Sequence, residues 1–348
     1  MTEKTISLIL IGFGHVGRAF YRLVDEKSDR VKGRNGLDLA IRAILNSKGG
    51  VLSDRPITSK SWPGGPIGDL TGHPSWRQGL NLEAALKAIE PGAVVECTPS
   101  NLKTGEPALS YVRLALDNGC HVVTANKGPL VVDFKGLKQK AEDKSLALEF
   151  SAAAGAALPG LDVGRYSLAG AEIMRIEGIL NGTTNYILTQ MAQGIRYEDA
   201  LREAKAKGIA EPDPSQDVEG WDTAVKILLL ANAVLGLDLT LGDIDVQGIT
   251  EVPDHLRIAA KAEGKVLKLL GKIHKAGARF KAEVKLTAID SAHPLFGVNG
   301  TNKGITFFTD TMGEVTVTGG KSDPRGAAAA LLKDIINIFR RIQTTNIS

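Results

Sequence analysis

The feature that most constrains this chain is an apolar run, Ile6–Ile11, which ends in a glycine-rich turn. Such a run predicts a strand buried on both faces, and a helix pattern follows from His15 to Lys27. GxGxxG between such elements lets a pyrophosphate approach the backbone and the amides of the helix N-terminus. We therefore predict a dinucleotide site at Gly12, Phe13, Gly14, His15, Val16 and Gly17. Flavoproteins share this motif, and a plain strand-turn-helix is the alternative to a binding site.

The first 150 residues repeat this alternation of strand and helix. Further strands are expected at 37–46, 93–98, 120–126 and 146–151, and helices at 81–90, 104–118 and 134–144. The Gly- and Pro-rich stretch 49–79 has the composition of a loop. Repeated strand-helix units predict an α/β fold with a Rossmann-type doubly wound parallel sheet, in a dinucleotide-binding domain of residues 1–150.

The sequence changes character after Ser151, where a small-residue, glycine-rich stretch begins. Strand patterns follow at 172–182, 266–275, 278–289, 304–310 and 314–319. Helix patterns lie at 183–194, at 197–208, from about Val218 onward and beyond Asp254. We predict a second, α+β domain of residues 151–321. A final amphipathic helix at 322–341 is expected to pack back on the first domain.

Composition and charge argue against several classes of protein. The net charge of +3 comes without a long basic block, so nucleic acid is not an expected partner. The two cysteines, Cys97 and Cys120, suggest no disulfide framework, and the histidines form no cluster with metal-ligand spacing. No apolar run reaches the roughly 20 residues of a membrane span, and the N-terminus lacks a signal-peptide pattern. We expect a cytoplasmic protein without membrane association.

The end of the second strand bears on the choice of coenzyme. NAD-binding proteins usually carry an acid there for the ribose 2′-hydroxyl, whereas this chain has Asn46, followed closely by Lys48. A lysine favours a 2′-phosphate, so we expect NADP(H) to be preferred over NAD(H). The alternative is that Lys48 only solvates a loop.

Later strands of the same sheet end in further candidates. In open α/β sheets, ligands bind outside the carboxyl ends of the strands. Thr98, Pro99 and Ser100 follow one strand, and Lys127 follows the next. We expect these residues to line the ligand crevice, with Lys127 meeting bound substrate, although a lysine at a strand end is often only exposed to solvent.

The stretch 208–226 combines several carboxylates with a single lysine at its end. Ser215 or Asp217 is expected to cap the helix that begins near Val218. An apolar stripe is expected along it through Val218, Trp221, Val225, Leu228, Leu229, Asn232 and Leu235.

Asp222 and Lys226 lie one helical turn apart on a neighbouring face, and Lys226 is the only charged residue between Asp222 and Asp238. An uncompensated buried ammonium costs several kcal/mol, so Lys226 needs Asp222 or a ligand as its partner. Burial would also suit Lys226 to proton transfer. The alternative is an exposed ion pair worth about 0.3–0.5 kcal/mol.

These groups together indicate hydride chemistry on an amino-acid aldehyde, or the reverse oxidation. Carboxylates such as Glu211 would hold a substrate ammonium. Lysines would neutralise the carbonyl oxygen as hydride arrives and supply its proton.

Over nearly the whole chain the sequence resembles the homoserine dehydrogenase family. The resemblance is carried by GFGHVG, VVTANKGPL, GILNGTTNYIL and GIAEPDPSQDVEGWDTAVK, of which the last two are long and specific. It implies NAD(P)-dependent interconversion of L-homoserine and L-aspartate 4-semialdehyde, in threonine, methionine and isoleucine biosynthesis. It also implies a homodimer that pairs through the sheet of the second, catalytic domain.

The resemblance also implies roles for individual residues. Lys226 matches the catalytic lysine, Asp222 matches its aspartate partner, and Lys127 matches the lysine on the nicotinamide side. The matching substrate-binding positions are Glu211, Asp217, Gly182 and Thr183. The family often binds a monovalent metal ion through backbone carbonyls, which here would be those of Ala154, Ala156 and Leu158.

The chain departs from the family pattern in two places. Ser151 stands where the family commonly has an acid near the metal-binding turn, and the late loop against the cofactor reads Gly319–Asp323. Because the chain ends soon after its final helix, no C-terminal regulatory domain is expected, and no threonine feedback through one.

Two other functions are alternatives: a dehydrogenase for another amino-acid aldehyde, and a non-catalytic NADPH-binding regulator on the same scaffold. The GTTN and EPDP patterns argue against the first. The presence of Lys127, Lys226 and Glu211 argues against the second.

Overall fold

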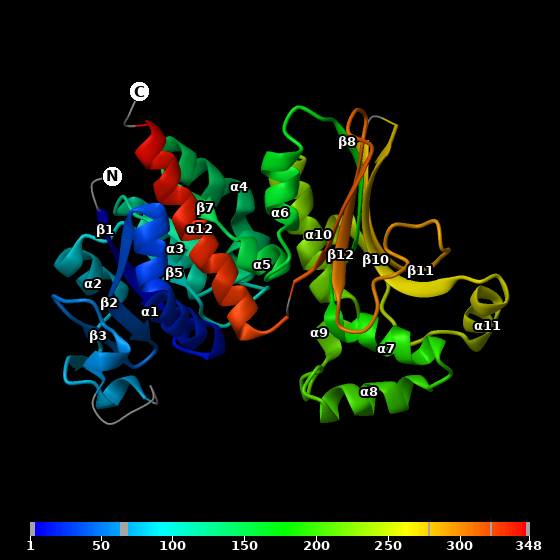
Figure 1. The fold of residues 1–348 in the computed structure, drawn as a ribbon, viewed down its shortest axis with the longest axis horizontal. Helices are drawn as coiled ribbons and strands as arrows, with labels where there is room; N and C mark the ends of the chain where they lie inside the picture. The colour runs from blue at the N-terminus through cyan, green and yellow to red at the C-terminus, as the bar shows by residue number, and fades with distance from the viewer. Residues whose placement is uncertain (1–3, 63–68, 278, 321, 346–348) are drawn as a thin grey trace. The chain divides into compact units, whose positions relative to one another are not determined.

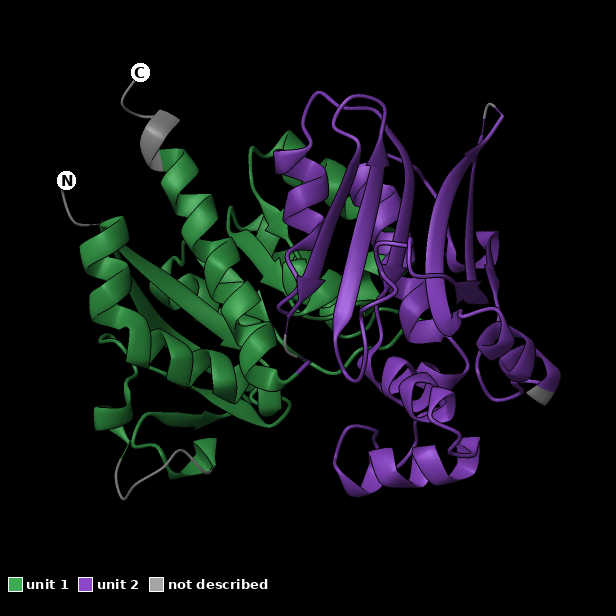
Figure 2. Cartoon of the chain, turned by 45° about the vertical axis from the view of Figure 1, so that its right-hand side comes forward, with its two compact units in different colours: residues 1–156, 323–348 green, residues 157–322 purple. Residues whose placement is uncertain are grey.

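The fold is that of a computed structural model, which describes residues 4–62, 69–277, 279–320 and 322–345. The chain divides into two compact units, one of residues 1–156 with 323–348 and one of residues 157–322 (Figure 2). In the described ranges no helix is both long enough and apolar enough to cross a membrane.

The first unit is built on a seven-stranded sheet in the order β4-β3-β2-β1-β5-β6-β7 (Figure 1). Its strands are β1 (Lys4–Ile11), β2 (Leu37–Asn46), β3 (Gly49–Leu52), β4 (Trp76–Gln78), β5 (Ala93–Glu96), β6 (His121–Thr124) and β7 (Leu148–Glu149). β1 is parallel to β2 and β5, and the order continues in parallel through β6 to β7. The predicted doubly wound Rossmann-type sheet is therefore confirmed, and its strand order reverses beside β1, where such sheets bind ligands.

Helices cover both faces of this sheet. They are α1 (His15–Asn35), α2 (Leu82–Ile89), α3 (Ala108–Asp117), α4 (Gly128–Asp143), α5 (Ser151–Gly155) and α12 (Pro324–Thr345), with 3₁₀ turns at Ser59–Ser61 and Leu70–Gly72. α12 lies along α1, and buried side chains such as Phe20 and Leu331 fill one core. Leu86 and Val112 contribute to the core on the other face, under α2 and α3. Each such side chain contributes about 1.5–3 kcal/mol through burial.

The prediction of a plain loop at 49–79 was wrong, because this stretch contains β3 and β4, which pair antiparallel at the sheet edge. The Asn46 side-chain oxygen accepts hydrogen bonds from the backbone N–H groups of Lys48 (2.8 Å) and Gly49 (3.2 Å). This local turn reverses the chain and sends β3 back along β2.

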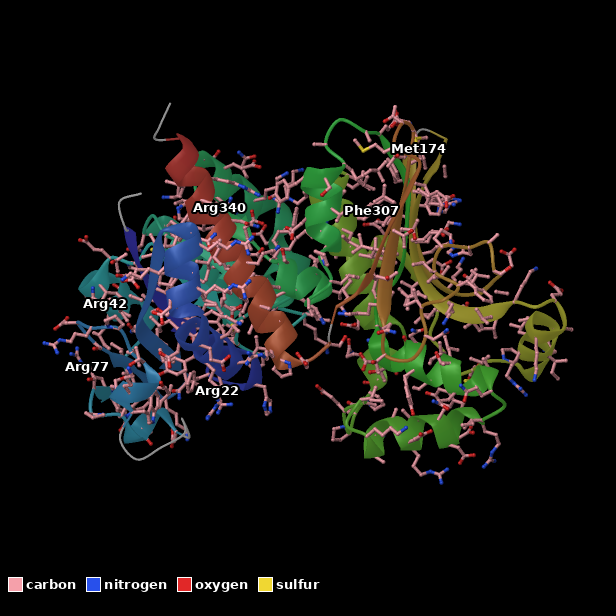
Figure 3. All side chains as sticks on the ribbon, in the orientation of Figure 1. Arg22, Arg42, Arg77, Met174, Phe307 and Arg340 are labelled. Atoms are coloured by element: carbon pink, nitrogen blue, oxygen red, sulfur yellow. The ribbon has the colours of Figure 1, made fainter. Side chains whose placement is uncertain are left out.

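The second unit is built on a six-stranded sheet in the order β13-β12-β8-β10-β11-β9. Its strands are β8 (Ile173–Ile179), β9 (Ile244–Val246), β10 (Val266–Ala276), β11 (Arg279–Ile289), β12 (Lys303–Thr309) and β13 (Glu314–Gly319). All neighbours run antiparallel except β9 and β11. Phe307 of β12 is fully buried, whereas Met174 near the start of β8 is exposed; both are labelled in Figure 3.

Among the helices of the second unit, α10 makes the most extensive contact with the sheet, against β9, β10 and β11. These helices are α6 (Gly160–Asp162), a π-helical turn (Val163–Ser167), α7 (Gly182–Ala192), α8 (Tyr197–Ala206), α9 (Ser215–Val218), α10 (Trp221–Val234), a 3₁₀ turn (Leu241–Asp243) and α11 (Asp254–Ala262). A Cβ on Gly271 of β10 would lie 2.4 Å from Ile227 Cγ1, so glycine there lets α10 approach the strand closely.

Three predictions about the region after Pro214 were wrong. The helix is split into α9 and α10 at Gly220, which has a φ of 90° that favours glycine. Neither Ser215 nor Asp217 caps α9 with its side chain; Asp213 instead accepts a hydrogen bond from the Ser215 N–H at 3.1 Å. Trp221 is 37% exposed and leaves the apolar stripe, because the break at Gly220 changes which face is buried.

A buried lysine fixes the loop between β11 and β12. Lys268 of β10 is 2% exposed, and its Nζ donates to the Val298 carbonyl (2.6 Å), Asn299 Oδ1 (2.9 Å) and Asn185 Oδ1 (3.1 Å). Asn185 of α7 donates in turn to the carbonyls of Val298 and Asn302. These partners are neutral oxygens, and burial lowers the pKa of Lys268 to about 8.

This pKa predicts how stability depends on pH. Between pH 8 and 10.5 the unfolded chain binds more protons at Lys268 than the folded chain does. The contribution of Lys268 to the free energy of unfolding should therefore rise as pH rises from about 8 to 10.5, and should level off below pH 8, where both states bind the proton. Urea unfolding at a series of pH values measures the free energy of unfolding of the unaltered protein and of Lys268→Met. The difference between the two values at each pH gives this contribution.

The matched control is Lys281→Met, which removes an exposed lysine of β11. Its difference from the unaltered protein should stay flat across the same pH values. A flat difference for Lys268→Met as well would contradict the lowered pKa.

Candidate functional site

In the glycine turn between β1 and α1, the backbone of Gly12 packs tightly against the protein, whereas the backbone of Gly14 has free space beside it. Gly12 has a φ of 89°, and a Cβ there would lie 2.5 Å from the Cys97 carbonyl carbon. A Cβ on Gly14, by contrast, would meet nothing within 4 Å. Phe13 is buried and stacks on Trp62, while His15 is exposed and Val16 half-buried at the start of α1. The turn therefore offers free backbone and a helix N-terminus to a phosphate group.

A hollow of about 140 Å³ lies beside the carboxyl end of β2. Asn46 and Lys48 line it from the β2–β3 turn, and Tyr111 lines it from α3. Among the described residues that line this hollow, none carries a carboxylate. The two residues predicted to mark the ribose position thus share one hollow, which has a lysine at its border.

A nearby carboxylate was missed in the sequence. The pKa of Asp69 is lowered first by its hydrogen bonds with Thr71, and more weakly by the charges of Lys48 and Arg18. Asp69 therefore lies within electrostatic range of Lys48. No sequence signal marks it, since it comes from the loop region before β4 rather than from the end of β2.

The loops after β5 and β6 bring together a second set of predicted residues. The Lys127 N–H donates to Ser100 Oγ at 3.2 Å, at the start of α4. Asn126, which the sequence analysis missed, donates from Nδ2 to the carbonyls of Thr98 (3.1 Å) and Pro99 (3.2 Å). Thr98, Pro99, Ser100 and Lys127 therefore belong to one hydrogen-bonded group at the carboxyl ends of these strands.

In the second unit, Lys226 forms a largely buried ion pair. Its Nζ donates to Asp222 Oδ2 at 2.6 Å and to the Leu180 carbonyl at 2.8 Å. The side chains of Lys226 and Asp222 are 13% and 10% exposed. This burial argues against the alternative of an ordinary surface pair. In the described part of the chain these two bonds use two of the three N–H donors of the ammonium, which leaves one for a ligand.

Asn181 connects this pair to a second carboxylate and was missed in the sequence. Its Nδ2 donates to Asp217 Oδ1 (2.6 Å) and to Asp222 Oδ2 (2.8 Å). Its Oδ1 accepts from the Thr184 N–H at 2.9 Å and so caps α7. The available signal was an asparagine directly before the GTTN helix start, which is a typical N-cap position.

Gly182 and Thr183 lie at the same helix start. A Cβ on Gly182 would lie 2.9 Å from the Thr301 carbonyl oxygen, so the chain passes closely there. Thr183 donates from its hydroxyl to the Ile209 carbonyl at 3.1 Å, which ties α7 to the loop that carries Glu211. Glu211 itself is exposed, and within the described ranges no ion pair holds its carboxylate. Ammonium and carboxylates are thus grouped around one helix N-terminus, with Glu211 on the adjoining loop.

The turn predicted to bind a metal ion crosses the point in the sequence where the first unit ends and the second begins. Ala154 and Ala156 belong to the first unit and Leu158 to the second. Although Ser151 is not acidic, its N–H (3.0 Å) and its hydroxyl (2.8 Å) both donate to the carboxylate of Asp334 from α12. Burial raises the pKa of Asp334 to about 6. An acid therefore reaches the start of this turn from a distant part of the sequence.

The late loop at 319–323 is described only in part. A Cβ on Gly320 would lie 2.5 Å from the Leu158 backbone nitrogen, so Gly320 packs against that segment of the second unit. Lys321 of the predicted loop lies outside the described residues. In the part of the chain with described side chains, no three His, Cys, Asp or Glu residues group as metal ligands.

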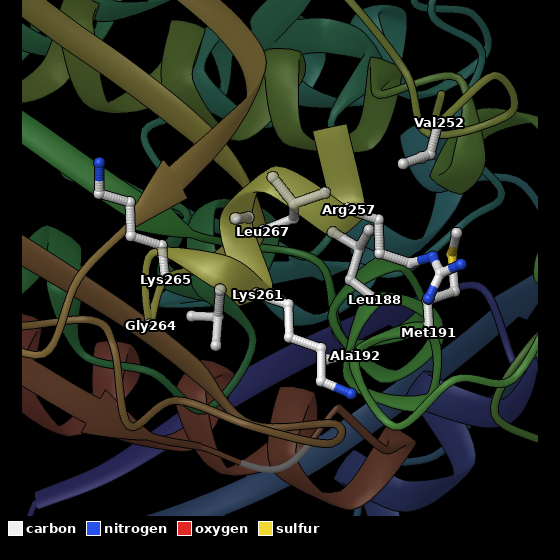
Figure 4. A pocket seen from close by; sticks show the side chains of 11 residues that line it. Leu188, Met191, Ala192, Val252, Arg257, Lys261, Gly264, Lys265 and Leu267 are labelled. Atoms are coloured by element: carbon white, nitrogen blue, oxygen red, sulfur yellow. The ribbon is translucent and has the colours of Figure 1, made fainter. Parts of the chain in front are cut away.

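Another hollow, of about 210 Å³, lies in the second unit and contains none of the predicted site residues (Figure 4). Leu188 and Met191 of α7 form part of its apolar wall, and Arg257, Lys261 and Lys265 lie at its border. Among the described residues that line it none carries a carboxylate, so these residues offer no counterpart of the Lys226–Asp222 pair.

Comparison with known proteins gives matches over both units. Residues 12–151 match the family model described as "Homoserine dehydrogenase, NAD binding domain", and residues 159–336 match the one described as "Homoserine dehydrogenase". The chain is 38% identical over 341 residues to the homoserine dehydrogenase of Methanocaldococcus jannaschii, covering 96% of this chain and 98% of that one. It is 34% identical over 344 residues to the NAD(+)-dependent homoserine dehydrogenase of Pseudomonas canavaninivorans, covering 98% and 97%.

Solved structures agree with these relatives. A homoserine dehydrogenase from Thiobacillus denitrificans has a TM-score of 0.81 at 26% identity, covering 99% of this chain and 75% of that one. One from Thermoplasma acidophilum has a TM-score of 0.79 at 25% identity, covering 97% and 100%. The two alternative functions are not favoured by any of these matches.

The glycine turn yields a prediction that separates binding from folding. Gly14→Val should leave thermal stability nearly unchanged, because the added side chain meets open space. It should weaken dinucleotide binding by about tenfold or more, because that space is where phosphate must approach. Thermal melting and calorimetric titration with NADPH and NADH measure the two effects.

Gly12→Ala is the comparison variant and should differ from Gly14→Val in its thermal stability. Its Cβ would collide with the Cys97 backbone, so thermal stability should fall. Unweakened coenzyme binding by a stable Gly14→Val protein would contradict this account of the turn.

Proposed function

The chain belongs to the homoserine dehydrogenase family, and we propose that it interconverts L-homoserine and L-aspartate 4-semialdehyde with a nicotinamide coenzyme. The observation that carries the proposal is the buried Lys226–Asp222 pair of α10, which is bonded to the Leu180 carbonyl just before α7. One N–H donor of this ammonium is left for a substrate. An ammonium held in this way can bond an alcohol or carbonyl oxygen and can exchange a proton with it.

The first unit has the residues that a nicotinamide coenzyme needs. The open backbone at Gly14 and the N-terminus of α1 fit the phosphates. Thr98, Pro99 and Ser100 would border the nicotinamide, with Lys127 beside them. When bound, the coenzyme accepts the hydride of the alcohol or returns it to the aldehyde.

The chain's own residues then have separate tasks. Lys226, Lys127 or both act on the substrate oxygen, as proton donor or as stabiliser of its negative charge. Asp222 orients Lys226 and balances its charge, and the Leu180 carbonyl fixes the same ammonium from a second direction.

The substrate's amino group is assigned to the carboxylates. Glu211 is exposed on its loop and free to pair with an ammonium, and Asp217 lies near it in sequence, held by Asn181. Gly182 and Thr183 contact the substrate at the start of α7. Backbone and hydroxyl groups there contribute hydrogen bonds without adding charge.

We propose NADP(H) as the preferred coenzyme over NAD(H). Support comes from the hollow beside β2, where Lys48 stands and where none of the described lining residues carries a carboxylate. A 2′-phosphate would meet a positive charge there. The nearby Asp69 would weaken this preference, because its carboxylate repels a phosphate.

Further proposals follow from family membership. A monovalent metal ion is assigned to the backbone carbonyls of Ala154, Ala156 and Leu158; the Asp334 carboxylate near this turn is already paired with Lys333 Nζ at 2.8 Å, so the carbonyls would have to hold the ion. We also propose a homodimer that pairs through the sheet of the second unit, a cytoplasmic location, and a role in threonine and methionine biosynthesis.

The assay that tests the function follows nicotinamide absorbance with L-homoserine and either NADP⁺ or NAD⁺. Turnover with at least one coenzyme is expected, together with reduction of L-aspartate 4-semialdehyde in the reverse direction. Absence of turnover with both coenzymes would contradict the proposed function.

Lys226→Ala tests the proposed role of the ammonium. It should lower kcat by about 10²-fold or more, because general acid–base catalysis contributes that much. Steady-state kinetics at saturating coenzyme measure the effect, with circular dichroism as the check on folding. Lys205→Ala, which removes an exposed lysine of α8, is the matched control and should keep normal turnover. A folded Lys226→Ala protein with near-normal kcat would return this residue to a structural role.

Lys48→Ala tests the coenzyme preference. It should lower kcat/KM for NADP⁺ about tenfold relative to NAD⁺, because a bond between two charged groups is worth roughly 1.5–3 kcal/mol. The backbone N–H of Lys48 makes the turn with Asn46, so truncating the side chain leaves that turn intact. Lys87→Ala, on the exposed face of α2, should leave the ratio unchanged. An unchanged ratio for Lys48→Ala would contradict the preference for a 2′-phosphate.

A further inference from the structure

A fully buried carboxyl group lies at the centre of the first unit's ligand edge. Glu96 is the last residue of β5 and is 0% exposed. It pairs in register with Ile11, the last residue of β1, and with Thr124, the last residue of β6. Glu96 therefore stands where the carboxyl ends of the central strands meet, which is the ligand edge of such a sheet.

Only neutral groups donate to this carboxyl group in the hydrogen bonds of the described residues. Oε1 accepts from the Thr98 N–H at 2.7 Å and also from the Thr98 hydroxyl. Oε2 accepts from the Thr124 hydroxyl at 2.8 Å. Burial raises the pKa of Glu96, and these hydrogen bonds act against that rise. A carboxyl group is costly to bury, so this position needs an explanation beyond packing.

Asn126 extends the network into the next loop. Its N–H donates to Thr124 Oγ1 at 2.9 Å, and its Nδ2 donates to Thr98 Oγ1 at 3.2 Å. Its Oδ1 accepts from the Gly128 N–H at 2.8 Å, at the start of α4. The loop after β5 and the loop after β6 are thus joined through Glu96 and its two threonine partners.

These two loops lie on the nicotinamide side of the proposed coenzyme site. The glycine turn after β1 fixes the pyrophosphate, and the end of β2 fixes the adenosine ribose. The other half of a dinucleotide must then extend over β5 and β6, on the opposite side of β1. Glu96 lies under that half and away from the adenosine half.

We propose that Glu96 is a positioning residue for the nicotinamide half of the coenzyme, which holds the loops 97–100 and 125–128 in the arrangement that this half needs. The inference rests on the proposed coenzyme site. Glu96 touches neither coenzyme nor substrate in this account, and acts through Thr98, Thr124 and Asn126. It therefore affects binding of the nicotinamide portion and leaves binding of the adenosine portion alone.

The experiment compares each coenzyme with a fragment that lacks the nicotinamide. Calorimetric titrations use NADPH with 2′,5′-ADP, and NADH with ADP-ribose, so that either coenzyme preference can be followed. The variants are Glu96→Ala, which removes both acceptors, and Glu96→Gln, which keeps the shape and an acceptor for Thr98. Val112→Ala, which trims the buried core from α3, is the matched control for lost stability.

Glu96→Ala should raise the Kd of the whole coenzyme about tenfold and the Kd of its fragment by less than about twofold. Glu96→Gln should return the coenzyme Kd to within about threefold of the unaltered protein, and Val112→Ala should change neither Kd. Equal weakening of coenzyme and fragment, or no weakening of either, would overturn the inference.

If Glu96→Ala does not fold, Thr124→Val decides the matter. It keeps the side-chain shape and removes the hydroxyl that links Glu96 to Asn126, so it should weaken coenzyme selectively, by about threefold or more. Equal weakening of coenzyme and fragment binding by Thr124→Val, or no weakening of either, would overturn the inference.

The failure of this inference can be told apart from the failure of the proposed function. Coenzyme binding without turnover of L-homoserine would contradict the proposed function alone. Absence of coenzyme binding by the unaltered protein would contradict both.

Discussion

The burial of the Lys226 ammonium is the constraint on which the candidate site of the second unit depends. A buried charge of this kind is tolerated only with a close counter-charge and further hydrogen bonds. Asp222 supplies the counter-charge one turn away on α10, and the Leu180 carbonyl supplies the second bond from the chain just before α7. These bonds hold α10 and the start of α7 together, so the placement of one ammonium sets the geometry of both helices.

Asn181 adds further hydrogen bonds to the Lys226–Asp222 pair and the start of α7. Its amide nitrogen donates to two carboxylates while its oxygen caps α7, so the helix start and both acids are oriented by one side chain. This explains why two separate motifs of the sequence are long. GILNGTTNYIL contains the cap and the helix start, whereas the EPDP…GWD…K stretch contains the acids and the lysine that the cap must meet. If either motif lacked one of these residues, a buried hydrogen-bond donor or charge would have no partner, which costs stability.

The fold was predictable from the sequence wherever burial leaves a pattern. β1 and β2 are apolar because both faces of a central parallel strand are covered, and the glycine turn adds its own spacing. β3 and β4 were not predictable, because strands of four and three residues are too short to leave a periodic pattern. The break at Gly220 was missed because periodicity does not record a left-handed glycine, and that one residue moved Trp221 to the surface.

The candidate site was predictable to a different extent. Charged residues at strand ends and on an apolar helix, such as Lys127 and Lys226, stand out in a sequence because burial makes them costly. Asn126 does not stand out, and Asn181 is marked only as an N-cap, because a neutral side chain acquires its further role from partners far along the chain. The supply of an acid to Ser151 by Asp334 is the extreme case, because the two residues are 183 positions apart in the sequence.

The coupling between Asn181 and Asp222 is the most direct test of this arrangement. A double-mutant cycle would compare kcat/KM for L-homoserine oxidation among the unaltered protein, Asn181→Ala, Asp222→Ala and the double variant. If Asn181 acts by orienting the Asp222–Lys226 pair, the double variant should lose little more activity than Asp222→Ala alone, with a coupling energy of about 1 kcal/mol or more. Losses that simply add would show that the two residues act independently, and would contradict a site organised around the buried ammonium.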